Sequence, residues 1–143
     1  MVLLVVGDGE LWDELEKKST LLNLGDKVRF LGQRDDVPDL LQAADIFVLP
    51  SLHEGLPGVA IEAQAAGLPC LLANTITKSA KVTEYIEFLS IDKGVEIWAE
   101  RMLAYRDFCR LDTYEDVRKT GYDIHDAAKW LEEFYQDALK KIL

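Results

Sequence analysis

A loop that leads directly into a helix carries the residues best placed to do chemistry. Gly55 and Gly58 leave the loop without side chains at two positions, and Pro57 suits the first helical turn, where its missing N–H costs nothing. The N–H groups of Gly58, Val59 and Ala60 would then be free to hold an anion. The helix macrodipole adds roughly 0.3–1 kcal/mol to such a contact, and up to about 2 kcal/mol in a partly buried site. This segment therefore predicts a phosphate site that needs no basic side chain.

Two glutamates flank this expected phosphate site. Glu62 lies about one turn into the helix, and helical side chains lean back toward the N-terminus. Its carboxylate can therefore accept two hydrogen bonds from a vicinal diol such as a ribose. Glu54 precedes the helix and approaches from the other side of the phosphate. Each glutamate alone also fits a solvated surface residue, and a glycosidase pair would face one bond with no phosphate between. Together they favour a ligand that joins a phosphate to a hydroxyl-rich group.

A second loop, Gly7-Asp8-Gly9, directly follows the first apolar run of the chain. Ligands of open α/β sheets bind beyond the carboxyl ends of the strands, which is where this loop is expected. A dinucleotide-binding fingerprint would have a third glycine where Trp12 stands. The pattern fits a tight strand-to-helix turn without a ligand equally well.

The elements expected to position these loops alternate between strands and helices. Five apolar runs, the last of them weaker, predict strands at residues 2–6, 28–31, 46–49, 69–73 and 88–91. These runs are apolar at every position rather than at every second one. That pattern is typical of a parallel sheet covered on both faces, so the fold class is α/β.

Helices are expected between these strands. The apolar face of the first is formed by Leu11, Leu15 and Leu22. Gly25 is placed to stop this helix, and Asp35 or Asp36 to cap the next one. The third is expected over residues 57–66, with Gly67 after it.

After Lys93 the chain is expected to be nearly all helix, with a break at Gly121. Apolar residues of the last helix recur at three- and four-residue steps, which predicts one buried face: Ala127, Leu131, Phe134, Ala138 and Ile142. We therefore expect a single domain over residues 1–143, with an α/β portion at 1–92 and a helical tail at 93–143.

Composition and charge narrow the classes of partner. The 143 residues suffice for one domain, and 16 basic against 26 acidic side chains give a net charge of −10. Nucleic acid and anionic lipid repel such a chain. Its longest apolar run, residues 1–6, is far shorter than the ~20 residues that cross a bilayer. Cys70 and Cys109 show no paired spacing, so neither a disulfide framework nor a zinc site is expected, and a reducing cytoplasm fits best.

Other reactive or aromatic residues have simpler interpretations. His53 lies in the site loop, where it either touches a ligand or is solvated, and His125 fits a surface or capping residue. Cys70 fits a small hydrophobe in a buried strand. Four aromatic residues of the tail are more typical of a core or a domain interface than of a sugar platform: Trp98, Trp130, Phe134 and Tyr135.

The ordered motifs resemble one enzyme family. The run Ser51-Leu52-His53-Glu54-Gly55-Leu56-Pro57, followed by Glu62-Ala63-Gln64-Ala65-Ala66-Gly67-Leu68-Pro69, is similar to the E-x7-E signature of family-4 retaining glycosyltransferases. Val5-Val6-Gly7-Asp8-Gly9 and Val28-Arg29-Phe30-Leu31-Gly32 fall where that family has a strand with GxG and a strand ending in FLG. Those enzymes have the GT-B architecture, two Rossmann-like domains with a cleft between them. The resemblance covers about Val2 to Ala73 and implies the carboxy-terminal, donor-binding domain, a Rossmann-like parallel sheet with helices on both faces.

The resemblance also implies roles for residues of both loops. Glu62 would bind the donor ribose, and Glu54, as the catalytic residue, would contact the donor sugar or set its geometry. Gln33 and Arg34 would edge the base pocket. The other donor-binding residues that it implies are Gly7, Gly9, Gly55, Leu56, Pro57, Gly58 and Val59. In such enzymes the leaving diphosphate assists attack from the same face, so neither a metal nor another cofactor is expected.

The sequence departs from the family pattern in three ways. An Arg and a Lys that clamp the diphosphate in the family belong to a preceding strand–helix unit, whereas the first basic residue here is Lys17 on a helix. In the strand order 3-2-1-4-5-6 that unit supplies a central strand, so its absence would leave unpaired edges. We therefore expect part of a longer enzyme, or half of an assembly, with the amino-terminal domain missing. Finally, Thr75-Ile76-Thr77-Lys78-Ser79 replaces a Gly-rich segment and resembles an exopolysaccharide and capsule subgroup.

The sequence thus predicts the donor-binding part of a retaining glycosyltransferase. It would move a sugar from a UDP- or GDP-linked donor to a glycan or lipid-linked acceptor held by the missing amino-terminal domain, in surface polysaccharide synthesis. This chain alone would be inactive. The expected location is cytoplasmic, with any contact at the inner face of the membrane made by the missing half. The alternatives are a non-catalytic α/β binding module of the same shape and a sugar-phosphate epimerase or phosphorylase of similar architecture.

Overall fold

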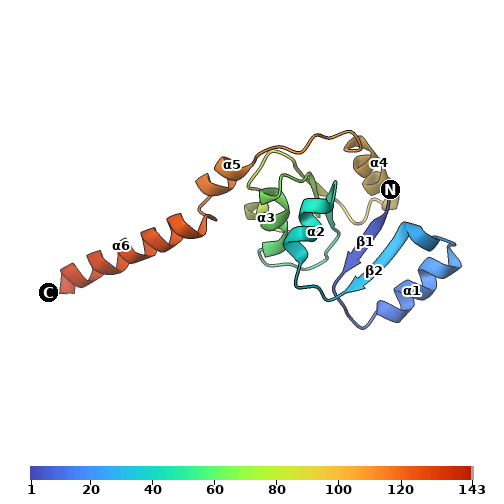
Figure 1. Cartoon of the computed structure of the whole chain (residues 1–143), viewed down its shortest axis with the longest axis horizontal. Helices are drawn as coiled ribbons and strands as arrows, with labels where there is room; N and C mark the ends of the chain where they lie inside the picture. Colours follow the sequence, from blue (N-terminus) through green and yellow to red (C-terminus); the bar gives the residue numbers. More distant parts are fainter. Residues whose placement is uncertain (143) are drawn as a thin grey trace. The chain divides into compact units, whose positions relative to one another are not determined.

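Two compact units make up the chain, residues Met1–Val37 and Pro38–Leu143. The computed structural model describes the backbone of residues 1–142 and the side chains of residues 1–140 (Figure 1). Each unit holds a parallel sheet of its own, two-stranded in the first and three-stranded in the second. The parallel strands predicted from the continuous apolar runs are confirmed.

The first unit joins β1 (Leu3–Val6) to β2 (Val28–Gly32) through α1 (Trp12–Leu21) and the short 3-10 turn η1 (Gly25–Lys27). The two strands run parallel with Leu3 opposite Val28, so both end at the same edge. Trp12 of α1 packs edge-on against Phe30 of β2, with 5.3 Å between the ring centroids. This contact holds the helix on the two-stranded sheet.

Asn23 ends the first helix, whereas the sequence predicts a stop at Gly25. Asn23 has a φ of 52°. Its N–H donates to the carbonyl of Thr20, and the N–H of Leu24 donates to that of Ser19. This is the Schellman arrangement, in which asparagine can occupy the left-handed position that glycine usually fills. The leucines of the expected apolar face are exposed: Leu11, Leu15 and Leu22.

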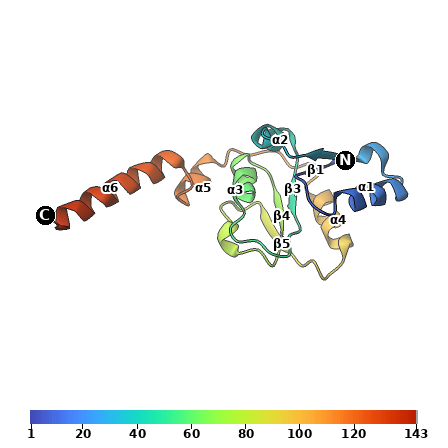
Figure 2. The same ribbon diagram turned by 90° about the horizontal axis from the view of Figure 1, so that it is seen from below.

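In the second unit the central strand is β4 (Cys70–Ala73), which pairs in parallel with β3 (Phe47–Leu49) and β5 (Ile86–Leu89). All four residues of β4 are completely buried. The helices that follow the strands are α3 (Gly58–Ala65) and α4 (Val95–Ala104), which Figure 2 shows on opposite sides of this sheet. Burial on both faces explains why β4 is apolar at every position. A shorter helix, α2 (Val37–Ala43), precedes β3, and the 3-10 turn η2 (Lys78–Ala80) follows β4.

The fifth strand begins at Ile86, two residues before the apolar run at Phe88 that predicts it. Glu87 interrupts the apolar pattern but lies inside the strand. Its carboxylate accepts hydrogen bonds from the Arg101 guanidinium, at 2.7 Å from Nε, and from the Tyr105 hydroxyl at 2.6 Å. Arg101, on the following helix, therefore satisfies the charge of Glu87 inside the strand. That charged residue is what makes the strand hard to predict from the sequence.

The second half is helical in three pieces rather than two: α4, α5 (Tyr114–Lys119) and α6 (Ile124–Ile142). The segment between α4 and α5 is not helical, and the side chain of its Arg110 binds the carboxyl ends of earlier helices. Arg110 donates to the carbonyls of Leu41 at 3.2 Å, Ala44 at 2.5 Å and Ala66 at 2.9 Å. The predicted break at Gly121, where φ is 84°, is confirmed.

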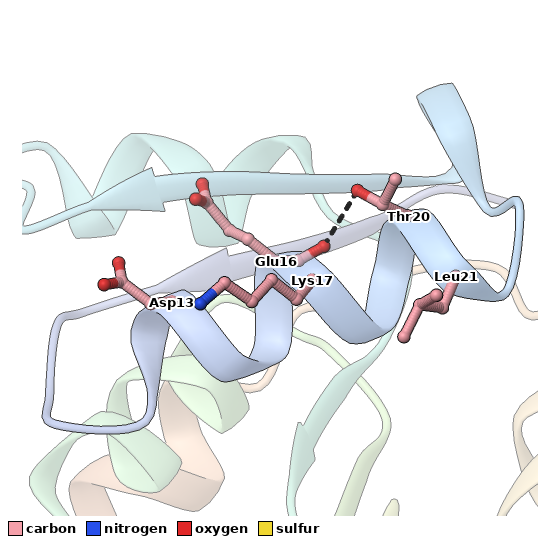
Figure 3. Close-up of a pocket in the computed structure, with 5 residues that line it drawn as sticks. All are labelled: Asp13, Glu16, Lys17, Thr20 and Leu21. Carbon is pink, nitrogen blue, oxygen red and sulfur yellow. Dashed lines mark hydrogen bonds between the residues drawn. The ribbon is translucent and has the colours of Figure 1, made fainter.

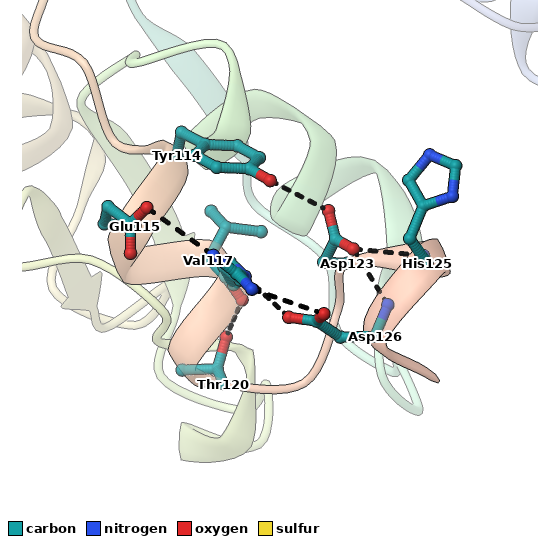
Figure 4. Close-up of polar contacts among 8 residues, drawn as sticks. Tyr114, Glu115, Val117, Thr120, Asp123, His125 and Asp126 are labelled. Carbon is teal, nitrogen blue, oxygen red and sulfur yellow. Dashed lines mark hydrogen bonds and ion pairs between the residues drawn. The ribbon is translucent and has the colours of Figure 1, made fainter. Parts of the chain in front are cut away.

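Asp123 caps the last helix (Figure 4). Its Oδ1 accepts from the N–H groups of His125 and Asp126, both at 3.0 Å. Asp126 in turn pairs with Arg118 of α5, at 2.6 Å from Nε. His125 is therefore a surface residue whose backbone is capped, not itself the cap.

The apolar face predicted for α6 is not buried against any described residue. Leu131 is 45% exposed and Phe134 54% exposed, while the side chain of Ile142 lies outside the described part of the chain. Trp130 and Tyr135 are also exposed, whereas Trp98 of α4 is buried and donates from Nε1 to the carbonyl of Ser90. Of these four aromatic residues only Trp98 lies in the core, and the interpretation of the other three as domain-interface residues stays a prediction. The amphipathic pattern of α6 predicts that the helix has an apolar face, but it does not predict which part of a protein packs against that face.

The strands of the described residues that keep one edge unpaired include β1 and β3. Among the described residues β1 pairs only with β2, and β3 pairs only with β4. These are the strands that the doubly wound order would place beside a central strand, so the unpaired edges agree with that order. None of the described helices is both long enough and apolar enough to span a bilayer.

Candidate functional site

The amino end of α3 forms the centre of the candidate site. The helix begins at Gly58, and Pro57 is its extended N-cap, with φ of −73° and ψ of 107° and no side-chain hydrogen bond to the helix. Pro57 is thus one residue outside the helical turn in which the sequence places it. The N–H of Ala60 donates to the Pro57 carbonyl at 3.1 Å, so this group is not free as expected. Among the described residues, the N–H groups of Gly58 and Val59 have no acceptor.

In the sequence, one of the two glutamates precedes this helix start and the other follows it. Glu54 and Glu62 are both exposed, Glu54 on the loop after β3 and Glu62 on α3 between the buried residues Ile61 and Ala63. Neither carboxylate hydrogen-bonds or pairs with a side chain of the described residues. Both are therefore available to a ligand.

The loop between β3 and α3 is anchored at its base and open at its tip. Pro57 is buried, whereas Leu52, His53, Gly55 and Leu56 are exposed. The Thr75 hydroxyl, in the loop after β4, donates to the carbonyl of Ser51 at 2.7 Å. This bond joins the two loops that follow neighbouring strands. Sequence reasoning missed Thr75, although a hydroxyl two residues after a buried strand was a usable signal.

Gln64 is a second residue that sequence reasoning missed. Its amide is completely buried on α3. It bonds to Ala60, Ala80, Val82 and Thr83, all at 2.8–3.2 Å. The signal in the sequence was a single uncharged polar residue inside an otherwise apolar helix face.

In the first unit the predicted residues lie at the carboxyl ends of β1 and β2. Gly7 has a φ of 115°, a conformation that favours glycine, and its N–H donates to Gly32 at 2.8 Å. Gln33 donates from Nε2 to Oδ2 of Asp8 at 2.8 Å, which links the two loops. Gly9 is exposed on the same loop as Asp8.

Arg34 is engaged within its own loop. Its guanidinium donates from Nε to Asp36 at 2.7 Å, a contact that lowers the pKa of that carboxyl and raises the pKa of Arg34. Asp36 thereby serves as an ion-pair partner, although the sequence suggests it as a helix cap. The predicted residues thus form two sets, Gly7, Gly9, Gln33 and Arg34 in the first unit and Glu54 to Glu62 in the second.

A surface depression on α1 contains none of these residues (Figure 3). It is lined by Asp13, Glu16, Lys17, Thr20 and Leu21. The Thr20 hydroxyl already donates to the Glu16 carbonyl at 3.0 Å. Nor do the described residues include a group of three or more histidine, cysteine or acidic side chains arranged to hold a metal ion.

Comparison with known proteins decides the family. Residues 1–106 match the family model described as glycosyl transferases group 1. The chain belongs to this family. The resemblance inferred from the two glutamates and the glycine loops is therefore confirmed, and with it the class of enzyme.

Relatives of this chain are named as enzymes that transfer sugars. The chain is 33% identical to a Bacillus subtilis (strain 168) protein named as the glycosyltransferase EpsF, over 97% of this chain and 37% of EpsF. It is 49% identical to UDP-Gal:alpha-D-GlcNAc-diphosphoundecaprenol alpha-1,3-galactosyltransferase of Escherichia coli, over 51% of this chain and 19% of that protein. The chain thus spans well under half of the length of either relative.

The fold matches that of a solved structure. Anabaena HepE, crystallised with UDP and glucose, superimposes on 95% of this chain and 40% of its own with a TM-score of 0.72 and 19% identity. At this identity the likeness shows the fold alone, and it confirms the Rossmann-like, GT-B type of α/β fold. The roles of Glu54, Glu62 and the loop glycines stay predictions.

Proposed function

We propose that this chain is the donor-binding part of a retaining glycosyltransferase. The whole enzyme would transfer a sugar from a nucleotide-diphosphate sugar to a glycan or lipid-linked acceptor during surface polysaccharide synthesis. The observation that carries the proposal is the start of α3, where two N–H groups without acceptors lie between two unpaired glutamates in a chain of this family. The acceptor would be held by an amino-terminal domain outside this chain.

The donor is proposed to carry UDP rather than GDP. The E. coli relative is named for UDP-galactose, and HepE was crystallised with UDP and with UDP-glucose. The same E. coli name gives a diphosphoundecaprenol-linked acceptor, and a Salmonella typhi relative is named for Vi polysaccharide biosynthesis. These names support a UDP-sugar donor and a lipid-linked or growing glycan acceptor.

Four residues in and next to the loop before α3 have a role in this proposed reaction. The N–H groups of Gly58 and Val59 would bind the diphosphate and stabilise the charge that it gains as the bond from the sugar carbon to the phosphate oxygen breaks. Glu62 would hold the ribose diol, and Glu54 would orient the donor sugar. The acceptor hydroxyl attacks on the face that the diphosphate leaves, and its proton passes to the departing phosphate oxygen. The balance of this step needs neither a metal nor a redox cofactor.

The proposed location is the cytoplasm. Both cysteines are free, with Cys70 buried and Cys109 exposed, as in proteins of reducing compartments. A lipid-linked acceptor would bring the whole enzyme to the inner face of the membrane, through the part outside this chain.

Sugar transfer by the full-length protein tests the proposal. We expect release of UDP from a UDP-sugar in the presence of a lipid-linked acceptor. Glu54→Gln should lower kcat by roughly tenfold or more, since one misplaced orienting contact costs at least a factor of that order. Glu100→Gln is the matched control, because Glu100 is an exposed glutamate of α4 outside the loop. Equal kcat for Glu54→Gln and Glu100→Gln, or a folded protein that consumes no nucleotide sugar, would support the non-catalytic module instead.

A further inference from the structure

Gln64 has an amide whose every donor and acceptor position is used. It lies on α3, two residues after Glu62, and its side chain is completely buried. Nε2 donates to the carbonyls of Ala60 at 2.9 Å and Ala80 at 2.8 Å. Because two carbonyls face this atom, it must be the NH2 end of the amide.

The Oε1 end faces three donors. It accepts from the N–H groups of Val82 and Thr83, each at 3.0 Å, and from the Thr83 hydroxyl at 3.2 Å. Thr83 is itself buried. One amide thus satisfies the carbonyl of Ala80, the last residue of η2, and the N–H groups of Val82 and Thr83, which follow η2 outside any strand or helix.

These residues lie at one end of the segment that runs from Thr75 to Thr83 after β4. Its other end is held by Thr75, whose hydroxyl donates to the Ser51 carbonyl. Ser51 opens the loop that carries Glu54, and its own hydroxyl reaches the carbonyl of His53 at 3.4 Å. The segment therefore bridges α3, which carries Glu62, and the loop that carries Glu54.

We propose that Gln64 is a positioning residue for the donor site. Its amide holds the Thr75–Thr83 segment against α3. The hydrogen bond from Thr75 to Ser51 then restricts the position of the loop that bears Glu54. The inference rests on the proposed function and assigns the geometry of Glu54 to a residue that touches no ligand. Because Glu62 stands on α3 itself, the nucleotide contact does not depend on this bridge. Gln64 acts on the sugar step and leaves nucleotide binding nearly unchanged.

Two variants in the full-length protein test this assignment. Gln64→Met keeps the length of the side chain and removes both polar ends of the amide, and Thr75→Val removes only the hydroxyl that reaches Ser51. We expect each to lower kcat for sugar transfer about tenfold while the Kd for UDP changes less than threefold. We expect the double variant to be no slower than the slower single variant, because both changes break the same bridge.

Thr113→Val is the matched control. Thr113 is also buried, and its hydroxyl donates at 2.7 Å to the backbone carbonyl of Gln64, at the far end of α3 from the site. It should lower the melting temperature without changing kcat. If Gln64→Met does not fold, the Thr75→Val variant still tests the proposal, because Thr75 is exposed. An unchanged kcat in Thr75→Val would show that the bridge through Thr75 does not position Glu54.

The possible outcomes separate the two proposals. A wild-type protein that consumes no nucleotide sugar overturns both. An active wild type whose Gln64→Met and Thr75→Val variants keep their kcat overturns the positioning role and leaves the donor site intact. Equal losses in kcat and UDP affinity, or a kcat loss in Thr113→Val as large as in Gln64→Met, would show a purely structural effect and overturn it too.

Discussion

At the scale of single residues, the carboxylate of Glu87 shows how the environment tunes a charge. Hydrogen bonds from Arg101, and then from Tyr105, lower its pKa, although partial burial opposes them. Burial and the bond to Glu87 raise the pKa of the Tyr105 hydroxyl, which keeps it a donor. Three side chains from β5 and the end of α4 thus stabilise one another.

The lowered pKa of Glu87 gives a prediction for stability against pH. A carboxyl with a lower pKa in the folded state stabilises the protein above its unfolded pKa, and this stability is lost as the pH falls through the folded value. We expect Glu87→Gln to lower the free energy of unfolding at pH 7 by about 1 kcal/mol, a charged hydrogen bond discounted for the exposure of Arg101. The difference from wild type should shrink below the ordinary carboxyl pKa of 4.5.

Urea unfolding at pH 7 and pH 3 measures this difference. Glu100→Gln, which removes an exposed glutamate of α4, is the control and should change neither value. A Glu87→Gln effect of the same size at both pH values would mean that packing, not the charge, provides the stability.

The two cysteines should differ in reactivity. Burial raises the pKa of the Cys70 thiol to about 12, and its Sγ donates to the Leu68 carbonyl at 3.4 Å. Cys109 is exposed. The thiolate is the reactive form, so a thiol reagent at pH 8 should label Cys109 quickly and Cys70 only after unfolding. Cys109→Ser should remove the fast phase, and rapid labelling that persists in this variant would show that β4 is accessible.

At the scale of elements, Arg110 ties the carboxyl ends of α2 and α3 to the segment between α4 and α5. Its planar fork reaches three backbone carbonyls and the Gln42 side chain, a pattern that the single ammonium of lysine cannot reproduce. We therefore expect Arg110→Lys to lower the free energy of unfolding by about 1–2 kcal/mol. Arg106→Lys, on an exposed neighbour, is the control. Equal unfolding midpoints for both variants would show that the contacts of the Arg110 guanidinium with α2 and α3 do not stabilise the protein.

The sequence predicts a helix or strand correctly where neighbouring residues determine its bounds. The prediction fails where a contact with a residue distant in the sequence determines them. The apolar runs of β1 to β4, and the glycine and proline before α3, correctly predict a loop between β3 and α3. The start of β5 depends on Arg101 satisfying Glu87, and the non-helical segment depends on Arg110 reaching two other helices. Gln64 was hidden for the same reason, since four of its five hydrogen bonds go to residues at least 16 positions away.

At the scale of the whole molecule, the structure contains the loops proposed to bind the donor but leaves apolar surface and strand edges uncovered within the described residues. β1 and β3 each pair on one side within the described residues, and Trp130 and Phe134 of α6 are exposed. The chain spans 37% of EpsF and 40% of HepE. The net charge of −10 suits a phosphate held by backbone N–H groups of α3 rather than by a basic surface.

Calorimetric titration of the full-length protein with UDP and GDP tests the donor site most directly. We predict saturable binding of UDP that Glu62→Gln weakens about tenfold or more, since a hydrogen bond to a charged group contributes about 1.5–3 kcal/mol. Glu100→Gln should bind as the wild type does, and GDP should bind more weakly than UDP. Unchanged UDP affinity in a folded Glu62→Gln variant, or no nucleotide binding by a folded wild type, would contradict the site at the start of α3.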